Sequence, residues 1–380
     1  IWGADIQLAQ YLDAGQVLYF EGVAEAMKQH PTEAPKLILC TAEPSWNYDK
    51  DEKLQGEDNL STITKIATDA GARIAAVVAG DLHHYSRYFN KDAGTSFVTA
   101  GGGGAYFSPT HYLKNVRKVT WGGKKLDLDL RCKIEDGKPT NEPSCWPTRG
   151  NSRRLSLSTL AFPFRNYGFA VALGVIYWVI IWMFSTTPYG GKTVGETLIS
   201  DPNFHWWPGI LMLAPLAAAT NVILGIWCLA LWVVLYGYAD GAWGGKVRAV
   251  LGTLHWAAHI SMMIALYYAV SYFSFYLVDT VWPQAKEVLQ NLELKWSAVV
   301  PELFRTIVIF PLVMIFIGGL AAGFVWGAYL TITCLFGLHC DQAFASMGIP
   351  DYKNFLRMKV EPNKLPIYST GLRRTPRRWA

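Results

Sequence analysis

A turn that holds one carboxylate and two imidazoles is the strongest candidate for chemistry in this sequence. Asp81, His83 and His84 lie within four residues, directly after Gly80 and the apolar run Arg73–Ala79. A glycine at that point would let the chain bend sharply. Carboxylate oxygens and imidazole nitrogens are ligands that suit Zn²⁺, Mn²⁺ or Fe. By spacing alone, a metal site and an ordinary surface turn are equally good interpretations.

Two further apolar runs end in residues of interest. Lys36–Thr41 leads into the segment Cys40–Trp46, which contains Glu43, and Ser96–Ala100 leads into four consecutive glycines at 101–104. The glycines lack the Gly-x-x-x-x-Gly-Lys pattern of nucleotide-binding phosphate loops. They favour instead a close approach of the backbone to a site.

The elements that would position these residues can be read from hydrophobic periodicity. Apolar residues recur at helical spacing over Ala14–His30 and Glu57–Ala70, and the three apolar runs are typical of buried strands. Helices that alternate with apolar strands predict a layered α/β domain with its chemistry at the strand ends.

The rest of the chain has a different composition. Only 13 of the 174 residues at 167–340 are charged, against 39 of the 166 residues before them. This excludes a single soluble domain, a disordered chain and a secreted disulfide scaffold. Four stretches are long enough to cross ~30 Å of hydrocarbon: Tyr167–Ser185, Pro208–Ala239, Ala249–Val278 and Thr306–Cys340. Dividing the second stretch in two would need a turn at Asn221, so four spans is the preferred count.

Basic residues predict the orientation of these spans. Arg149, Arg153, Arg154 and Arg165 precede the first span, and the tail 341–380 carries 8 basic and 3 acidic residues. Positive residues favour the cytoplasmic side, so we expect a multi-pass protein of the cell (inner) membrane with its soluble parts in the cytoplasm.

That compartment is reducing, and none of the six cysteines forms Cys-x-x-Cys. We therefore expect Cys132 and Cys145 to be free thiols. In the tail, Tyr352–Val360 and Leu365–Tyr368 predict a β-hairpin. Since a lone hairpin is marginally stable, we expect it to pack on the domain formed by residues 1–166.

Two histidines lie inside the third apolar stretch. His255 and His259 are four residues apart and therefore share one face of a helix. They could bind a metal, relay protons, or form hydrogen bonds to neighbouring helices.

The segments VVAGDLHHYSRY, LILCTAEPSW and FVTAGGGGAYFSPTH resemble those of calcineurin-like metallophosphoesterases, in particular a bacterial membrane-attached group. The four-span layout and the tail DYKNFLRMKVEPNKLPIYSTGLRRTPRRW are similar as well. The resemblance implies an incomplete α/β layered metallophosphoesterase-like domain and an all-α membrane domain of about four transmembrane helices. The corresponding division is residues 1–130, a basic linker at 131–166, the membrane domain at 167–340 and the tail at 341–380.

The resemblance also assigns roles to residues. His83 takes the place of a metal-binding histidine in the family's last motif, and Asp81 stands where that motif has its first histidine. Ala42 occupies the histidine position of the preceding motif, where neighbouring Glu43 would substitute as a ligand. His84 or His83 would orient the substrate or protonate its leaving group. Two divalent transition ions, Mn, Fe or Zn, are implied.

The family's earlier motifs, Asp-x-His, Gly-Asp-x-x-Asp and Gly-Asn-His-Asp/Glu, do not occur in this sequence. We expect them upstream of Ile1, so that the chain is a fragment and inactive alone. The predicted function is membrane-anchored hydrolysis of a phosphate ester by a two-metal site, with the lipid bilayer as partner and no nucleic acid.

Two other functions remain open. One is a degenerate phosphoesterase-like scaffold or regulator without catalysis, which would hold no metal. The other is a transport protein, which would need paired ionisable residues inside the spans.

Overall fold

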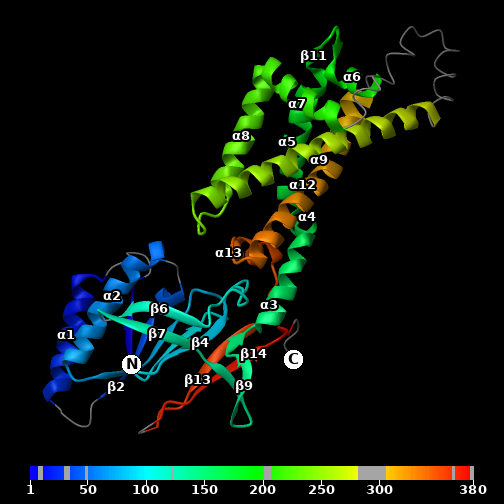
Figure 1. Cartoon of the computed structure of the whole chain (residues 1–380). Helices are drawn as coiled ribbons and strands as arrows, with labels where there is room; N and C mark the ends of the chain where they lie inside the picture. Colours follow the sequence, from blue (N-terminus) through cyan, green and yellow to red (C-terminus); the bar gives the residue numbers. More distant parts are fainter. Residues whose placement is uncertain are drawn as a thin grey trace. The chain divides into compact units, whose positions relative to one another are not determined.

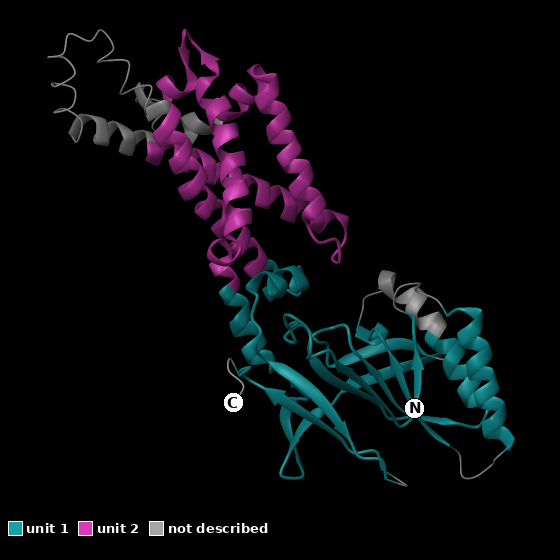
Figure 2. Ribbon diagram, turned by 180° about the vertical axis from the view of Figure 1, so that it is seen from behind, with its two compact units in different colours: residues 1–158, 333–380 teal, residues 159–332 magenta. Residues whose placement is uncertain are grey.

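The computed structural model describes residues 1–6, 12–29, 35–47, 50–121, 123–200, 207–280, 305–361 and 364–376. The chain divides into two compact units, which are coloured separately in Figure 2. Unit 1 comprises Ile1–Ser158 and Thr333–Ala380, and unit 2 comprises Thr159–Ile332. Unit 1 is therefore assembled from two segments that flank unit 2 in the sequence.

A mixed eight-stranded sheet forms the centre of unit 1 (Figure 1). Its strands are β1 (Trp2–Ala4), β2 (Lys36–Thr41), β3 (Arg73–Ala79), β4 (Tyr85–Asn90), β5 (Thr95–Ala100), β6 (Val116–Trp121), β7 (Lys124–Leu130) and β10 (Cys145–Trp146). They lie in the order β1-β2-β3-β5-β4-β7-β6, and β10 pairs with β4. The pairs among β1, β2, β3 and β5 are parallel, and all pairs that involve β4, β6, β7 or β10 are antiparallel.

The three strands predicted from apolar runs are present. β2 and β3 have the predicted bounds, and β5 begins one residue earlier than expected. Most side chains of these strands are buried on both faces of the sheet, which is why they appear as continuous apolar runs. The antiparallel strand β6 instead alternates exposed and buried residues, and Arg117 occupies one of its buried positions. Such polar strands were not predicted.

Two helices pack with the sheet around the main core. They are α1 (Ala14–Gln29) and α2 (Lys50–Asp69), which lie side by side in Figure 1, and the short 3₁₀ turn η1 (Ser45–Asn47) precedes α2. Leu60, Ile63 and Ala67 of α2 are fully buried, which confirms the predicted apolar face of this helix. They join residues of β2, β3 and β5 in one cluster.

The remaining elements of unit 1 are a peripheral hairpin, two short helices and the C-terminal hairpin. Their bounds are β8 (Cys132–Glu135), β9 (Lys138–Pro143), α3 (Arg149–Ser156), α13 (Cys340–Met347), β13 (Lys353–Met358) and β14 (Ile367–Leu372), and the 3₁₀ turn η2 (Leu157–Ala161) follows α3. The predicted tail hairpin is thus formed, although its second strand lies nearer the C-terminus than expected. β13 and β14 pair along their whole length.

The C-terminal hairpin contacts the sheet domain directly. The backbone N–H of Asn354 donates to the carbonyl of Gly102 at 3.4 Å. On β14, Gly371 lies against the ring of Trp146, so close that a Cβ at this position would be 2.7 Å from Cε2. The tail therefore packs on the sheet of unit 1, as a marginally stable hairpin requires.

Unit 2 is helical in its described residues, apart from one two-residue strand pair. Its elements are α4 (Phe162–Arg165), α5 (Tyr167–Thr186), β11 (Pro188–Tyr189), β12 (Lys192–Thr193), α6 (Val194–Ser200), α7 (Trp207–Thr220), α8 (Val222–Tyr238), α9 (Gly245–Thr280), the π-helical turn η4 (Arg305–Ile309) and α12 (Phe310–Leu335), which continues into unit 1. Among the described residues, three stretches are long and apolar enough to cross a membrane: Tyr167–Thr186, Gly245–Val270 and Ile307–Leu335. The count rises to four if the bent pair α7–α8 forms one span.

The second apolar stretch, which is predicted to form one span, is divided into two helices. It bends by 115° at Asn221, between α7 and α8. The Asn221 side chain accepts a hydrogen bond from the Leu224 N–H at 3.1 Å and donates one to Thr187 Oγ1 at 2.9 Å. Asparagine is a preferred N-cap residue, so a single polar side chain is enough to start a new helix here.

Candidate functional site

The segments with candidate chemistry follow the carboxyl ends of three neighbouring strands, β2, β3 and β5. Ends of parallel strands share one edge of a sheet, and ligand sites of α/β proteins occur at such edges. Two backbone hydrogen bonds join the segments: Gly80 N–H donates to the Ala42 carbonyl at 3.0 Å, and Gly101 N–H donates to the His84 carbonyl at 3.3 Å. The sheet therefore brings three segments together that are far apart in the sequence.

The turn after β3 differs in one detail from expectation. Asp81, rather than Gly80, adopts the left-handed backbone conformation, with φ of 55°. Aspartate tolerates this conformation better than most side chains. The Asp81 side chain is exposed at the turn.

His83 is held by the loop that follows β5. Its backbone N–H donates to Ser108 Oγ at 3.1 Å, and its carbonyl accepts from the Ser108 N–H at 3.0 Å. The imidazole meets the Tyr106 ring edge-on, with the centroids 4.6 Å apart. It also lies over Gly104, where an added Cβ would be 2.3 Å from Nε2. Gly104 thus allows the imidazole to occupy this position.

One nitrogen of the His83 ring is available as a ligand atom. The side chain is half-buried, and Nδ1 is buried without a hydrogen-bond partner among the described residues. A buried ring nitrogen in this condition is costly unless a ligand or ion satisfies it. The Nδ1 of His84 also lacks a partner among the described residues, but only His83 is partly exposed, so His83 is the histidine suited to meet a ligand.

His84 has a different environment. It is fully buried, and its Nε2 lies 3.2 Å from Ser86 Oγ. Burial, with smaller contributions from the positive charges of Arg117 and His83, lowers the pKa of His84 to about 3. The imidazole is therefore neutral at neutral pH and has no exposed surface for contact with a substrate. Its suggested role as a catalytic acid receives no support from this arrangement.

Glu43 is half-buried in the segment after β2. Among the described residues, one group of three His, Cys, Asp or Glu side chains brings its ligand atoms close together. Asp81, His83 and Glu43 are not that group. The fold brings their segments to one edge but leaves the side chains apart. Their assignment as metal ligands stays a prediction.

The group that does converge consists of His111, Cys334 and Cys340, whose ligand atoms all lie within 4.8 Å of one another. Sequence reasoning missed it because the histidine and the cysteines are separated by the whole of unit 2. The only signal was a Cys-x₅-Cys spacing near a predicted span end, which matches no common metal motif.

The histidine pair of the third apolar stretch lies inside unit 2. His255 and His259 are both buried in α9, with their Nε2 atoms 3.1 Å apart. Tyr177 of α5 reaches His259 Nδ1 at 2.6 Å, and Tyr329 of α12 stacks on the His255 ring at 3.9 Å between centroids. These contacts correspond to the interpretation in which the histidines bond to neighbouring helices.

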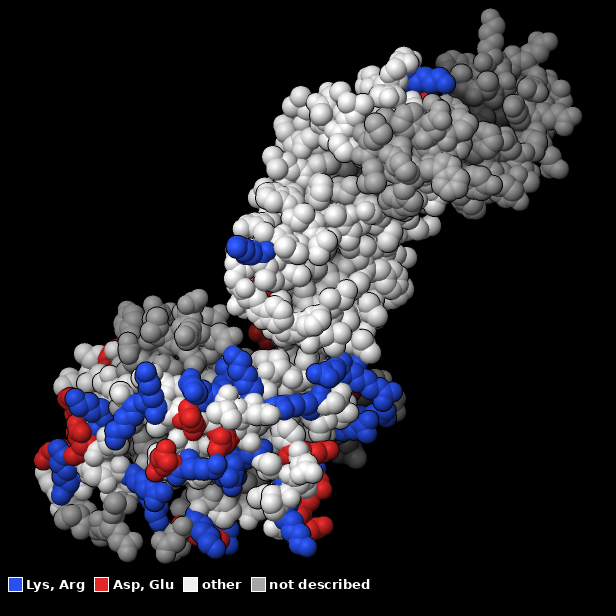
Figure 3. Space-filling view, viewed as in Figure 1, with Lys and Arg blue, Asp and Glu red and all other residues white. Residues whose placement is uncertain are grey.

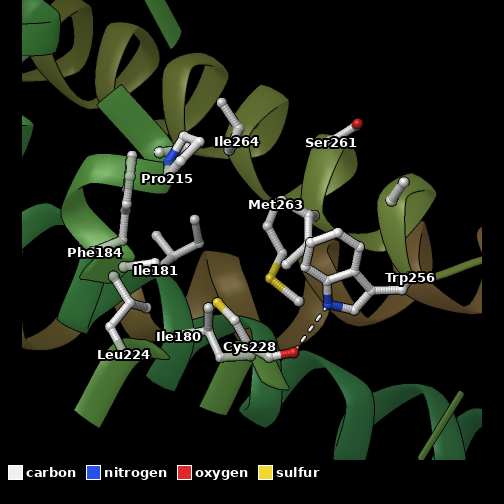
Figure 4. A pocket seen from close by; sticks show the side chains of 14 residues that line it. Ile180, Ile181, Phe184, Pro215, Leu224, Cys228, Trp256, Ser261, Met263 and Ile264 are labelled. Carbon is white, nitrogen blue, oxygen red and sulfur yellow. Dashed lines mark hydrogen bonds between the residues drawn. The ribbon is translucent and has the colours of Figure 1, made fainter. Parts of the chain in front are cut away.

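Unit 2 also contains an apolar cavity of about 330 Å³, bordered by α5, α7, α8 and α9 (Figure 4). Ser261 carries the only hydroxyl among the residues that line it. The indole N–H of Trp256 donates to the Cys228 carbonyl at 3.0 Å. A lining of this kind supplies few ligand atoms for an ion.

Charged surface side chains are concentrated on unit 1 rather than on unit 2. On the face in Figure 3, Lys, Arg, Asp and Glu side chains cover unit 1, whereas the described surface of unit 2 is almost uniformly uncharged. Exposed apolar side chains on α8 include Ile223, Ile226 and Val234. A surface of this size without charge is expected where a protein meets lipid or another protein.

Comparisons with known proteins found no matching family model, no matching curated protein and no matching solved structure.

Proposed function

We propose that this chain is the membrane-anchored part of a metal-dependent phosphoesterase, with its hydrolytic site at the carboxyl edge of β2, β3 and β5. The observation that carries the proposal is the pair of backbone bonds, Gly80 to Ala42 and Gly101 to His84, that bring the three segments to one edge. The resemblance of the same segments to metallophosphoesterase motifs supplies the reaction.

The chemistry of the donors fits divalent transition ions. His83 offers a half-buried imidazole whose Nδ1 has no hydrogen-bond partner among the described residues, and Asp81 and Glu43 offer carboxylates. Mixed oxygen and nitrogen donors suit Mn²⁺, Fe or Zn²⁺. When bound, two such ions would activate water and neutralise charge on the phosphoryl oxygens. Three donors are a partial set, so the complete site needs further ligands.

For the membrane part, the described helices provide three or four stretches that are long and apolar enough to span a bilayer. We propose the cell (inner) membrane as the location, with unit 1 in the cytoplasm. Arg149, Arg153, Arg154 and Arg165 beside α5 support this orientation, because positive residues favour the cytoplasmic side.

Metal binding provides the test. The full chain in detergent would be titrated with Mn²⁺ in a Cys334→Ser/Cys340→Ser background, which removes the thiol pair as a competing site. We expect His83→Ala to weaken Mn²⁺ binding at least tenfold and Glu43→Gln to weaken it less. Glu25→Gln, on the exposed surface of α1, is the matched control and should bind as the parent does.

The complete protein would then be assayed with bis(4-nitrophenyl) phosphate, where His83→Ala should abolish hydrolysis. Unchanged Mn²⁺ affinity in His83→Ala would contradict the proposed site.

The second candidate is a degenerate phosphoesterase-like scaffold. It is favoured by one observation: Asp81, His83 and Glu43 do not converge in the described structure. A scaffold would hold no Mn²⁺ in the titration and no transition metal in the complete protein.

A further inference from the structure

The His111–Cys334–Cys340 group joins three segments of unit 1. His111 lies in the loop between β5 and β6, Cys334 in the last turn of α12, and Cys340 at the first position of α13. The two sulfur atoms are 3.9 Å apart, and the two cysteines are not joined by a disulfide. Cys334 is fully buried, and His111 and Cys340 are half-buried.

Both nitrogen atoms of the His111 ring have a hydrogen-bond partner. Its Nε2 lies 2.8 Å from the carbonyl oxygen of Cys334, which can only accept, so Nε2 carries the proton. Its Nδ1 lies 2.9 Å from Ser152 Oγ, and this fully buried serine also accepts from the Thr110 N–H at 2.9 Å. The serine hydroxyl proton therefore points to Nδ1. Such a second contact fixes the ring as it does for metal-binding histidines.

We propose that His111, Cys334 and Cys340 form a binding site for a thiophilic divalent ion, with Zn²⁺ the best match. Two sulfurs and one imidazole nitrogen are a typical zinc donor set. Tetrahedral coordination with Zn–S of about 2.3 Å and Zn–N of about 2.0 Å places donor atoms roughly 3.5–3.8 Å apart. The observed separations, 3.9 Å between sulfurs and at most 4.8 Å within the group, need only small side-chain movements.

Binding would change the protonation of all three residues. Both thiols would release their protons to solvent. Nε2 would exchange its bond to the Cys334 carbonyl for the ion, and the ring would change tautomer, so that its one proton is on Nδ1 instead of Nε2. The Nδ1 contact to Ser152 would then reverse, with the ring donating to the hydroxyl. Three protein ligands leave a fourth position for water or another donor.

A structural role follows from the position of His111. The loop between β5 and β6 also contains Gly104, Tyr106 and Ser108, which contact His83. An ion at His111 would fix the other end of this loop to α12 and α13. The site shares no ligand with the proposed phosphoesterase edge, so each can fail without the other.

The experiment uses the full chain in detergent, reduced and stripped of metal with a chelator. Zn²⁺ would be added in competition with a chromophoric chelator, and Co²⁺ would serve as a spectroscopic probe of thiolate coordination. We expect one tight equivalent and a thiolate-to-cobalt charge-transfer band. Cys334→Ser, Cys340→Ser and His111→Asn should each raise the Kd for Zn²⁺ at least 100-fold and reduce that band.

Cys132→Ser, which alters an exposed thiol outside the group, should leave binding unchanged. Equal binding in parent and variants, or no tight equivalent in the parent, would overturn the site.

A second measurement needs no substitution in the group. Zn²⁺ should slow alkylation of the half-buried Cys340 at least tenfold in the unmodified chain, and a chelator should restore the rate, as followed by mass spectrometry of peptides. Alkylation that is indifferent to Zn²⁺ would contradict the proposal. So would recovery of the two cysteines as a disulfide from the reduced protein, because that pair would then be a redox element.

Discussion

Asn354 of the C-terminal hairpin and Gly102 of the loop after β5 are joined through their backbones, with the Asn354 N–H directed at the Gly102 carbonyl. The neighbouring Lys353 ammonium reaches the Gly104 carbonyl in the same loop. The tail of the chain thus rests on the glycine segment that also accommodates His83. Close packing, rather than phosphate binding, explains why a glycine is needed at 102.

This contact predicts a difference between two adjacent glycines. A Cβ at Gly102 would lie 2.5 Å from the Asn354 backbone nitrogen, whereas a Cβ at Gly103 would meet nothing within 4 Å. Gly102→Ala should therefore destabilise unit 1 by about 1–3 kcal/mol through overpacking. Gly103→Ala should change stability by less than about 1 kcal/mol, in the stabilising direction. Guanidinium denaturation of the full chain in detergent, followed by near-UV circular dichroism, measures both, and equal effects would contradict the packing of the hairpin.

The buried His84 predicts a pH dependence of stability. The unfolded chain takes up a proton on this histidine below about pH 6.5, but the folded chain does not until about pH 3, because burial lowers the pKa of His84. Stability should therefore fall as pH decreases through this window, by up to about 1.4 kcal/mol per pH unit from this group. In His84→Gln this contribution disappears, so the slope of unfolding free energy against pH between 7.5 and 5 should be smaller than in the parent. Parallel slopes would show that His84 is accessible to protons in the folded chain.

How far the sequence predicts the fold depends on the kind of burial. β2 and β3 were located to the residue, because strands buried on both faces are apolar throughout. β4 and β7 contain polar and charged residues, and besides their hairpin partners β5 and β6 they pair with each other, where Tyr88 lies opposite Leu130, a residue distant in sequence. The β-propensity of a segment reflects its own residues and therefore gives no information on a distant pairing partner.

The candidate sites show the same limit. The turn with Asp81, His83 and His84 could be found because its residues are adjacent, but the sequence could not show that His84 is closed to solvent. The His111–Cys334–Cys340 group depends on a contact between residues 223 positions apart, so local spacing contained no signal for it. The bend at Asn221 depends on one polar side chain inside an apolar stretch, which composition alone does not distinguish from a continuing helix.

A third prediction concerns the hydrogen bond between Tyr177 and His259, which is buried and 2.6 Å long. Tyr177→Phe removes the hydroxyl and leaves a buried ring nitrogen without its partner, which should cost about 1–2 kcal/mol. Tyr167→Phe is the matched control, because Tyr167 is 76% exposed. Thermal denaturation in detergent, read from the helical circular dichroism signal, should show a lower Tm for the first variant only. If both variants melt with the parent, the Tyr177 contact contributes nothing to stability.

The last prediction concerns the number of membrane crossings. Residues on both sides of the apolar region belong to the same compact unit, and one unit cannot lie on two sides of a bilayer. The number of crossings must therefore be even. Since α5, α9 and α12 supply three candidate spans among the described residues, the bent pair α7–α8 should complete a fourth despite its 115° angle. If α7–α8 entered and left on one side, the count would be odd.

Accessible cysteines can test this count in intact cells. Lys192 and Lys246 are exposed residues on either side of α7–α8. In a Cys132→Ser background, Lys192→Cys should react with a membrane-impermeant maleimide in intact cells, and Lys246→Cys only after permeabilisation. The native Cys132 is exposed and should behave like Lys246→Cys if unit 1 is cytoplasmic, whereas the buried Cys145 should stay unlabelled in both conditions. Labelling of both substituted positions from the same side would mean that α7–α8 is re-entrant, and rapid labelling of Cys132 in intact cells would reverse the proposed orientation.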